Sequence, residues 1–215
     1  MVQARAVAEH GGMLRSTSLI ALAGLACAFA AGCGDDAAPV AVVAKPKPAK
    51  ASNLERFLMR NDEEPGFKLI ASPLSASGAE SAGLPAEGQE QLRRNGYISQ
   101  TSQPIESDDT AGMTNVGLFK TEAGARDQLK WETSDAGIHS QIPDTKIRHF
   151  TVRGVPGARG WTGHDIHGNR IGHVFWVQGH CMFILGNEGS GPFVAGLSAG
   201  AKAIYRRTNG ECPCY

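Results

Sequence analysis

Residues 159–187 read RGWTGHDIHGNRIGHVFWVQGHCMFILGN, and this stretch decides the fold. Two apolar runs suited to β-strands, Ile171–Gln178 and Cys181–Leu185, follow a more polar run, Gly160–His167. The breaks between the runs are short turn signals, Gly168-Asn169 and Gly179-His180. Two residues between such runs is the spacing of tight hairpins. The stretch therefore predicts a three-stranded antiparallel meander at the centre of the hydrophobic core.

A two-residue turn at Gly168-Asn169 would fix which residues face each other across the first hairpin. Counting back from this turn sets His164 opposite His173, and Trp161 opposite Trp176. Because successive side chains of a strand alternate faces, the two tryptophans are expected to share one face. A one-residue slip in the turn would exchange the faces.

The second turn, Gly179-His180, sets the pairing on the other side of the middle strand. It places Phe183 and Leu185 on the tryptophan face, and Met182 and Ile184 on the opposite face. The middle strand is apolar on both faces, so both faces must be covered. Helices from elsewhere in the chain are expected to cover them.

Helix and strand signals alternate outside the meander. Capping residues predict helices beginning at Ser52, Thr121 and Ser190, and Pro85–Asn95 suits a short helix closed by Gly96. The apolar side of the last helix is expected to comprise Phe193, Leu197, Ala201 and Ile204. The expected strands are Phe67–Ala71, Tyr97–Ile105, Met113–Lys120 and Lys146–Val152, and the expected loop is Ser72–Gly83. This order predicts an α+β fold with an antiparallel sheet covered by helices.

The 215-residue chain contains 21 basic and 21 acidic residues, so its formal charge is balanced. A balanced charge gives no reason to expect nucleic acid as a partner. No uninterrupted apolar run reaches the roughly 18 residues of a membrane-spanning helix. The chain is therefore not expected to span a bilayer.

The N-terminus has the order of a secretory signal. Basic residues Arg5 and Arg15 precede Leu19–Ala31, a run of apolar and small residues. The end of this run forms the motif Ala30-Ala31-Gly32-Cys33 with the two residues that follow it. The small residues before a cysteine resemble the lipobox of bacterial lipoproteins. Ala30 departs from the leucine that is more common there.

The lipobox resemblance implies that the signal is cut before Cys33 and that the Cys33 thiol receives a diacylglyceryl group. The lipid would then hold the protein on the extracytoplasmic side of the bacterial cell membrane. The sequence does not distinguish the inner from the outer membrane. An ordinary signal peptide or an uncleaved anchor is the alternative. Cys27 is a poorer second lipidation candidate, and translation could begin at Met1 or at Met13.

Three segments are expected along the chain. Residues 1–32 form the signal, residues 33–51 form a linker rich in Ala, Pro and Lys, and residues 52–215 form one exported α+β domain. Two half-domains meeting near Asp135–Asp144 are the alternative. The pattern of strands and helices loosely resembles small exported domains of uncharacterised actinobacterial lipoproteins, and that resemblance supplies no catalytic residues.

Three cysteines would remain after lipidation: Cys181, Cys212 and Cys214. An exported protein is in an oxidising compartment, so one disulfide is expected. Cys181 with Cys212 is favoured, and Cys214 is the alternative partner. A redox pair or soft-metal site formed by Cys212 and Cys214 is a further alternative, although redox motifs normally place two residues between their cysteines.

Side chains of catalytic type concentrate in the meander: His164, Asp165, His167, His173 and His180. Facing each other, His164 and His173 could chelate zinc or copper, but the sequence offers no third ligand. No glycine-rich nucleotide motif is present. We therefore expect structural histidines, with no catalytic residue and no cofactor.

Three further features could bind a ligand. Trp161 and Trp176 could stack a sugar or an aromatic ligand if their face were open, although core packing is favoured. The acidic stretch Glu106–Thr110 lacks the spacing of a dedicated calcium loop, so a solvated loop is expected. Asn187–Gly191 could bind an anion at the start of the last helix, although capping by Ser190 is sufficient to explain it.

Together these features predict a lipid-anchored envelope protein that is not an enzyme. Its exported domain is expected to bind an unknown envelope protein or small ligand, and its oligomeric state is open. The alternative is an envelope metal-binding protein or metalloenzyme that uses His164 and His173.

Overall fold

The computed structural model describes residues 54–61, 63, 66–143, 145–165, 167–190 and 193–212. The strands are β1 (Lys68–Leu69), β2 (Leu74–Ser77), β3 (Tyr97–Ser107), β4 (Thr110–Phe119), β5 (Arg148–Thr151), β6 (Arg159–His164), β7 (Arg170–Gln178) and β8 (Cys181–Gly189). The helices are α1 (Ala86–Arg94), α2 (Glu122–Glu132), α3 (Asp135–Gln141) and α4 (Phe193–Thr208), with 3₁₀ turns η1 (Glu55–Phe57) and η2 (Ala79–Ala82). No helix within these ranges is long and apolar enough to cross a bilayer.

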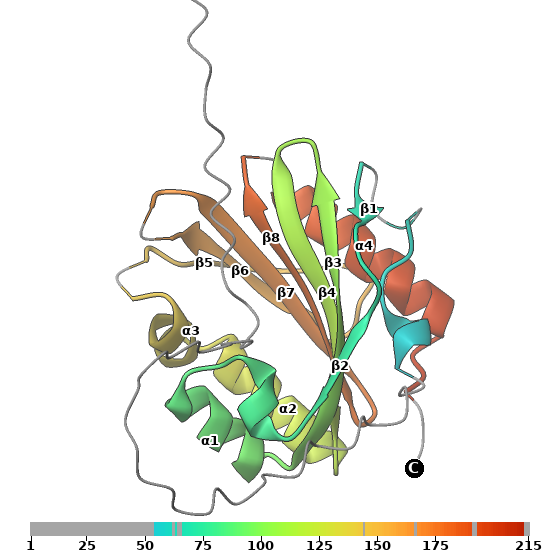
Figure 1. Cartoon of the computed structure of the whole chain (residues 1–215), viewed down its shortest axis with the longest axis vertical. Coiled ribbons are helices and arrows are strands. Elements are labelled where there is room, and N and C mark those ends of the chain that lie inside the picture. Colours follow the sequence, from blue (N-terminus) through green and yellow to red (C-terminus); the bar gives the residue numbers. More distant parts are fainter. Residues whose placement is uncertain are drawn as a thin grey trace, which may run out of the picture.

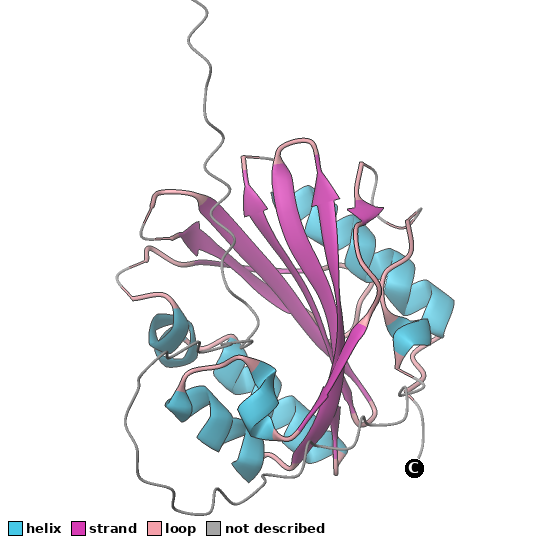
Figure 2. Ribbon diagram, in the orientation of Figure 1, coloured by secondary structure: helices cyan, strands magenta, loops and turns pink. Residues whose placement is uncertain are grey.

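The eight strands form one sheet in the order β1-β3-β4-β8-β7-β6-β5, and β2 also pairs with β3. All pairs are antiparallel. Figure 1 shows the twisted sheet with α1, α2 and α3 on one side and α4 on the other, and Figure 2 shows the same layers by secondary structure. The predicted α+β fold with a C-terminal meander is confirmed.

Several local predictions need correction. The 3₁₀ turn η1 replaces the helix expected after Ser52, and that residue lies outside the described ranges. Ser72–Gly83 contains β2 and η2 and is not a plain loop. The acidic stretch Glu106–Thr110 is a tight turn, because Ser107 pairs with Thr110 and leaves only Asp108 and Asp109 between the strands.

The second turn of the meander has the predicted register, and the first does not. Gln178 pairs with Cys181, so the residues Gly179-His180 form the second turn. In the first hairpin His164 pairs with Arg170, and Trp161 pairs with His173. The expected pairs His164–His173 and Trp161–Trp176 are therefore wrong.

The side chain of Asp165 explains the longer first turn. Its Oδ1 accepts hydrogen bonds from the backbone N–H groups of His167 at 2.9 Å and Asn169 at 2.8 Å. An aspartate that bonds the backbone ahead of it stabilises a turn in place of strand pairing. The hairpin therefore closes at His164 and not at His167.

This change of register separates the two tryptophans. One face of the sheet, the α4 face, presents Val174, Trp176, Phe183 and Leu185 to α4. The other, the α2 face, presents Trp161, Ile171, Phe175 and Met182 to α2. The predicted positions of Phe183, Leu185, Met182 and Ile184 relative to Trp176 are correct. The residues of β6, including Trp161 and His164, lie on the faces opposite to those predicted.

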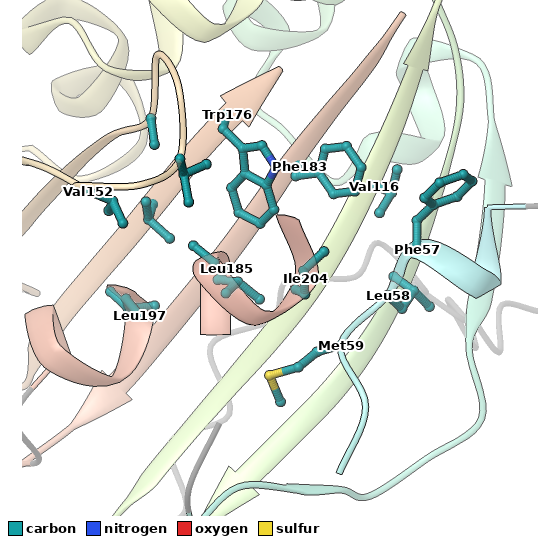
Figure 3. Close-up of a cluster of buried hydrophobic side chains, with 14 of the residues drawn as sticks. Phe57, Leu58, Met59, Val116, Val152, Trp176, Phe183, Leu185, Leu197 and Ile204 are labelled. Carbon is teal, nitrogen blue, oxygen red and sulfur yellow. The ribbon is translucent and has the colours of Figure 1, made fainter. Parts of the chain in front are cut away.

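Helix α4 covers one face with the residues that its spacing predicted. Phe193, Leu197, Ala201 and Ile204 are each at most 2% exposed. In Figure 3, Leu197 and Ile204 lie against the same cluster as Trp176, Phe183 and Leu185. Burying this apolar stripe is what holds α4 on the sheet.

The residues Leu54–Met59, here called the N-terminal strap, complete the cover of the α4 face. Leu54, Phe57, Leu58 and Met59 are each at most 3% exposed, and the Met59 N–H donates to the Thr114 hydroxyl at 3.1 Å. Figure 3 shows Phe57, Leu58 and Met59 beside this cluster. The segment that follows the linker is therefore part of the core.

A single arginine of α4 holds the strap. The Arg207 guanidinium donates to the carbonyl oxygens of Arg56 and of Leu58, the latter at 2.6 Å. It also forms an ion pair with the Glu63 carboxylate. The side chains of Arg207 and Glu63 are 18% and 9% exposed, so this pair is largely removed from water.

Candidate functional site

The proposed metal pair is separated by the sheet. His164 is exposed and lies on the α4 face, because it pairs with Arg170. His173 lies on the α2 face, opposite Trp161 and Gly186. The two imidazoles cannot share an ion, and the described ranges contain no group of three His, Cys, Asp or Glu side chains placed to hold one.

His173 lies among aromatic rings. Its ring centroid is 4.7 Å from that of Trp161 and 5.8 Å from that of Phe175. Gly186 makes this packing possible, because a Cβ at that position would lie 2.4 Å from His173 Cδ2. Within the described part of the chain, the buried Nδ1 of His173 has no hydrogen-bond partner. Burial lowers the pKa of His173 from 6.5 to about 4.

The depressed pKa of His173 predicts a loss of stability at mildly acidic pH. The unfolded chain takes up this proton near pH 6.5, whereas the folded protein resists it until about pH 4. The contribution of His173 to stability is therefore complete above pH 6.5 and is lost as the pH falls toward 4. Integrating the linkage relation gives a loss of about 2 kcal/mol in the free energy of unfolding between pH 7.5 and pH 5.

Urea titrations at several pH values, comparing the wild type with His173→Gln, measure this loss. We expect the variant to lose about 2 kcal/mol less than the wild type over the same pH interval. The exposed His167 provides the matched control, and His167→Gln should retain the wild-type pH dependence. If the free energy of unfolding of the wild type and of His173→Gln changes equally with pH, the interpretation of His173 as a neutral, buried imidazole is contradicted.

The remaining members of the histidine cluster have structural surroundings. Asn169 Nδ2 donates to Asp165 Oδ2 at 3.0 Å and to Glu188 Oε1 at 3.2 Å. Partial burial raises the pKa of Asp165, but hydrogen bonds from Asn169 and His167 outweigh it and lower the pKa overall. Burial, followed by the Asp165 charge, raises the pKa of Glu188. Asp165 therefore organises a turn through the backbone N–H groups of His167 and Asn169.

The tryptophans do not form a shared ligand surface. Trp161 is 2% exposed and packs on the α2 face. Trp176 is fully buried on the α4 face and stacks on Phe183 with ring centroids 4.9 Å apart. The prediction that both tryptophans lie on one face is wrong because the first hairpin has a different register.

The structure contains a disulfide between Cys181 and Cys212, with a Cα–Cα distance of 5.7 Å. It joins the first residue of β8 to the segment after α4. Cys214, the alternative partner, lies outside the described ranges, as do Cys33 and the rest of residues 1–51, in which the sequence predicts a signal and a linker.

Within the stretch Asn187–Gly191, the residues up to Gly189 are the end of β8. The Ser190 N–H donates to the Asp109 carbonyl oxygen at 3.3 Å, which ties this stretch to the turn between β3 and β4. Gly191 and Pro192 lie outside the described ranges. The predicted cap by Ser190 and the possible anion site therefore stay predictions.

A groove that the sequence did not indicate lies beside α2. It has a volume of about 270 Å³, is open to solvent on one side, and lies between α2, the loop before β6, and β7. Its apolar lining comprises Leu129, Pro156 and Val177, and its cations are Arg126, Lys130 and Arg159.

Two of the three cations of the groove already have partners on their own helix. Arg126 pairs with Glu122, and Lys130 Nζ lies 2.7 Å from Asp127 Oδ1. Within the described ranges Arg159 has no acidic partner. Arg126 and Lys130 are four residues apart, a spacing that indicates a basic side of α2. The position of Arg159 beside them follows only from the folded structure.

Neither a protein-family model nor a curated protein matches this chain. Among solved structures, the extracellular domain of PknH from Mycobacterium tuberculosis has a TM-score of 0.43 and 13% identity, covering 67% of this chain and 86% of that one. An uncharacterized protein of Mycobacterium smegmatis, the Rv0999 ortholog, has a TM-score of 0.43 and 9% identity, covering 66% of this chain and 89% of that one. TM-scores below 0.5 are too low to support a function.

Proposed function

We propose that this chain is a lipid-anchored bacterial envelope protein whose exported domain is a binding module and not an enzyme. The disulfide between Cys181 and Cys212 is the main support for export, because structural disulfides persist in oxidising compartments and are rare in the cytosol. The secretory signal ending at Cys33 agrees with it.

The N-terminal strap supports a role for the linker as a tether. The predicted linker ends at Ala51, three residues before Leu54, and the apolar side chains of the strap are buried in the core of the α4 face. A lipid on Cys33 would thus connect to the folded core through about twenty residues, which reach at most roughly 65 Å when extended.

The placement of reactive side chains favours binding over catalysis. His164 and His173 lie on opposite faces, and Asp165 closes a turn. The groove beside α2 instead combines an apolar lining with cations, which is the usual composition of a recognition surface. The metalloprotein alternative is not favoured, because its two candidate ligands are kept apart by the sheet.

Replacing Cys33 by Ala tests the lipid anchor. We expect the wild-type chain in the membrane fraction with an acylated N-terminal cysteine, and the Cys33→Ala variant free of acyl chains and largely released from the membrane fraction. A single acyl chain holds a protein only marginally, and two or more hold it stably. Mass spectrometry of the N-terminal peptide and membrane fractionation measure both effects.

The matched control is Cys27→Ala, which changes the poorer lipidation candidate and should leave acylation and fractionation unchanged. Membrane association of Cys33→Ala equal to that of the wild type would refute the lipid anchor on Cys33.

A further inference from the structure

We infer that the groove beside α2 binds an acidic segment of a partner protein, with an apolar side chain of that segment seated on Leu129 and Val177. This inference deepens the proposed binding role and depends on it. It follows from the composition of the groove, from its size, and from the side of the sheet on which it lies.

The cations around the groove can be recruited by an acidic ligand, although two of them already form exposed ion pairs. Arg159 has no acidic partner within the described ranges, and it lies at the start of β6 with its side chain exposed. The pairs of Arg126 with Glu122 and of Lys130 with Asp127 are exposed, with side-chain exposures between 47% and 69%. Exposed pairs of this kind contribute little stability, so their cations can be shared with an incoming carboxylate at little cost.

The apolar lining sets the second requirement for the ligand. Leu129 is 8% exposed and belongs to the core of the α2 face, and Val177 is half-buried beside it. An aliphatic side chain that covers them gains about 25 cal/mol for each Å² of apolar surface removed from water. An acidic segment with one leucine-like residue satisfies both the cations and the lining.

The size and openness of the groove favour a protein segment over a small molecule. Its volume of about 270 Å³ is at the lower limit for pockets that enclose small ligands. An open groove of this size would leave much of such a ligand in water. A peptide needs to insert only one side chain while its carboxylates lie on the rim.

The position of the groove favours a protein over the membrane. The N-terminal strap, where the linker enters the domain, packs on the α4 face. The groove lies on the α2 face, because its lining residues Leu129 and Val177 belong to that core. The sheet therefore separates the groove from the entry of the linker.

Fluorescence anisotropy with labelled pentapeptides tests this inference on the full-length chain in mild detergent. The acidic probe has the order Asp, Glu, Leu, Glu, Asp, and the basic probe has the order Lys, Arg, Leu, Arg, Lys. We expect the acidic probe to bind about tenfold or more tightly than the basic one, and to bind more weakly as NaCl rises from 50 to 500 mM, since salt screens exposed charges.

Single substitutions in the protein and in the probe separate the two requirements. Arg159→Gln should weaken binding of the acidic probe by about three- to fivefold, as expected for one exposed charge pair. The control Arg206→Gln removes another exposed cation, on α4, and should change binding less than twofold. Replacing the probe's leucine by serine should weaken binding. Because the protein is unaltered in this comparison, a change in its folding cannot account for the result.

Equal binding of the acidic and basic probes, or equal effects of Arg159→Gln and Arg206→Gln, would overturn the inference. Bicelles containing phosphatidylglycerol that displace the acidic probe, with a loss of displacement in Arg159→Gln, would reassign the groove to anionic lipid and overturn it too. The Cys33→Ala test does not involve the groove. Failure of the anchor and failure of peptide binding are therefore distinguishable.

Discussion

Replacing Arg207 by Ala is expected to lower the free energy of unfolding by about 3–5 kcal/mol, the range for breaking a largely buried ion pair. The change leaves the Glu63 carboxylate without its partner in a site where its side chain is 9% exposed. It also removes the donors to the carbonyl oxygens of Arg56 and Leu58. Urea denaturation of the wild type and the variant measures the difference.

The neighbouring Arg206 is a matched control because it lies on the same helix, is exposed, and differs by one position. Arg206→Ala should change the free energy of unfolding by less than about 0.5 kcal/mol, as is usual for surface positions. Adding Glu63→Ala to Arg207→Ala should recover part of the loss, because the unpaired carboxylate is then gone. A loss below about 1 kcal/mol in Arg207→Ala would mean that the strap is not held by this arginine.

Removing the disulfide by the double change Cys181→Ala and Cys212→Ala is expected to cost about 3–4 kcal/mol in the chain-entropy treatment of a cross-link. The bond closes a loop with a sequence separation of 31 residues, and that constraint on the unfolded chain would be lost. Cys181 is fully buried in the α4-face core, so the alanine adds a small cavity. Thermal unfolding with and without dithiothreitol measures the effect.

Dithiothreitol should lower the melting temperature of the wild type and leave that of the double variant unchanged. Cys214→Ala is the control that tests the alternative pairing, and it should unfold like the wild type. If Cys214→Ala loses as much stability as the double variant, Cys181 is bonded to Cys214 in solution and the Cys212 pairing is wrong.

A local sequence pattern was sufficient to predict the structure where no second pattern competed with it. The second turn of the meander has only Gly179-His180 between two apolar runs, and its predicted register is correct. The apolar side of α4 repeats at helical spacing, and those residues are buried. The cap of α2 was also predicted, and Thr121 Oγ1 accepts from the Gly124 N–H at 3.0 Å.

The prediction from sequence is wrong where two local patterns compete. Gly168-Asn169 has the composition of a hairpin turn, but Asp165 three residues before Gly168 supplies a side-chain acceptor that stabilises a longer loop. Helix α3 is not predicted from the sequence, because Asp135–Asp144 is interpreted there as the possible junction between half-domains. Its packing is tertiary, since Gly137 lies so close to the end of α2 that a Cβ there would be 2.1 Å from the Trp131 carbonyl oxygen.

The groove could not have been predicted from local patterns. Its residues come from α2, from the loop before β6, and from β7, which are separated in the sequence by up to about fifty positions. Only the antiparallel pairing of β6 with β7 and the docking of α2 on them bring Arg159 beside Arg126 and Lys130. The alternative in which His164 and His173 chelate a metal depended on one register, and the pairing expected from that register is wrong.

The N-terminal strap determines how tension would enter the folded head. A pull on the linker is received by Leu54–Met59, which is bonded to Thr114 on the interior strand β4 and to Arg207 on α4. A ligand pulling on the groove would act on the α2 face of the same sheet. With the proposed tether and the proposed ligand both in place, the sheet would lie between the two points of attachment and would transmit the force between them.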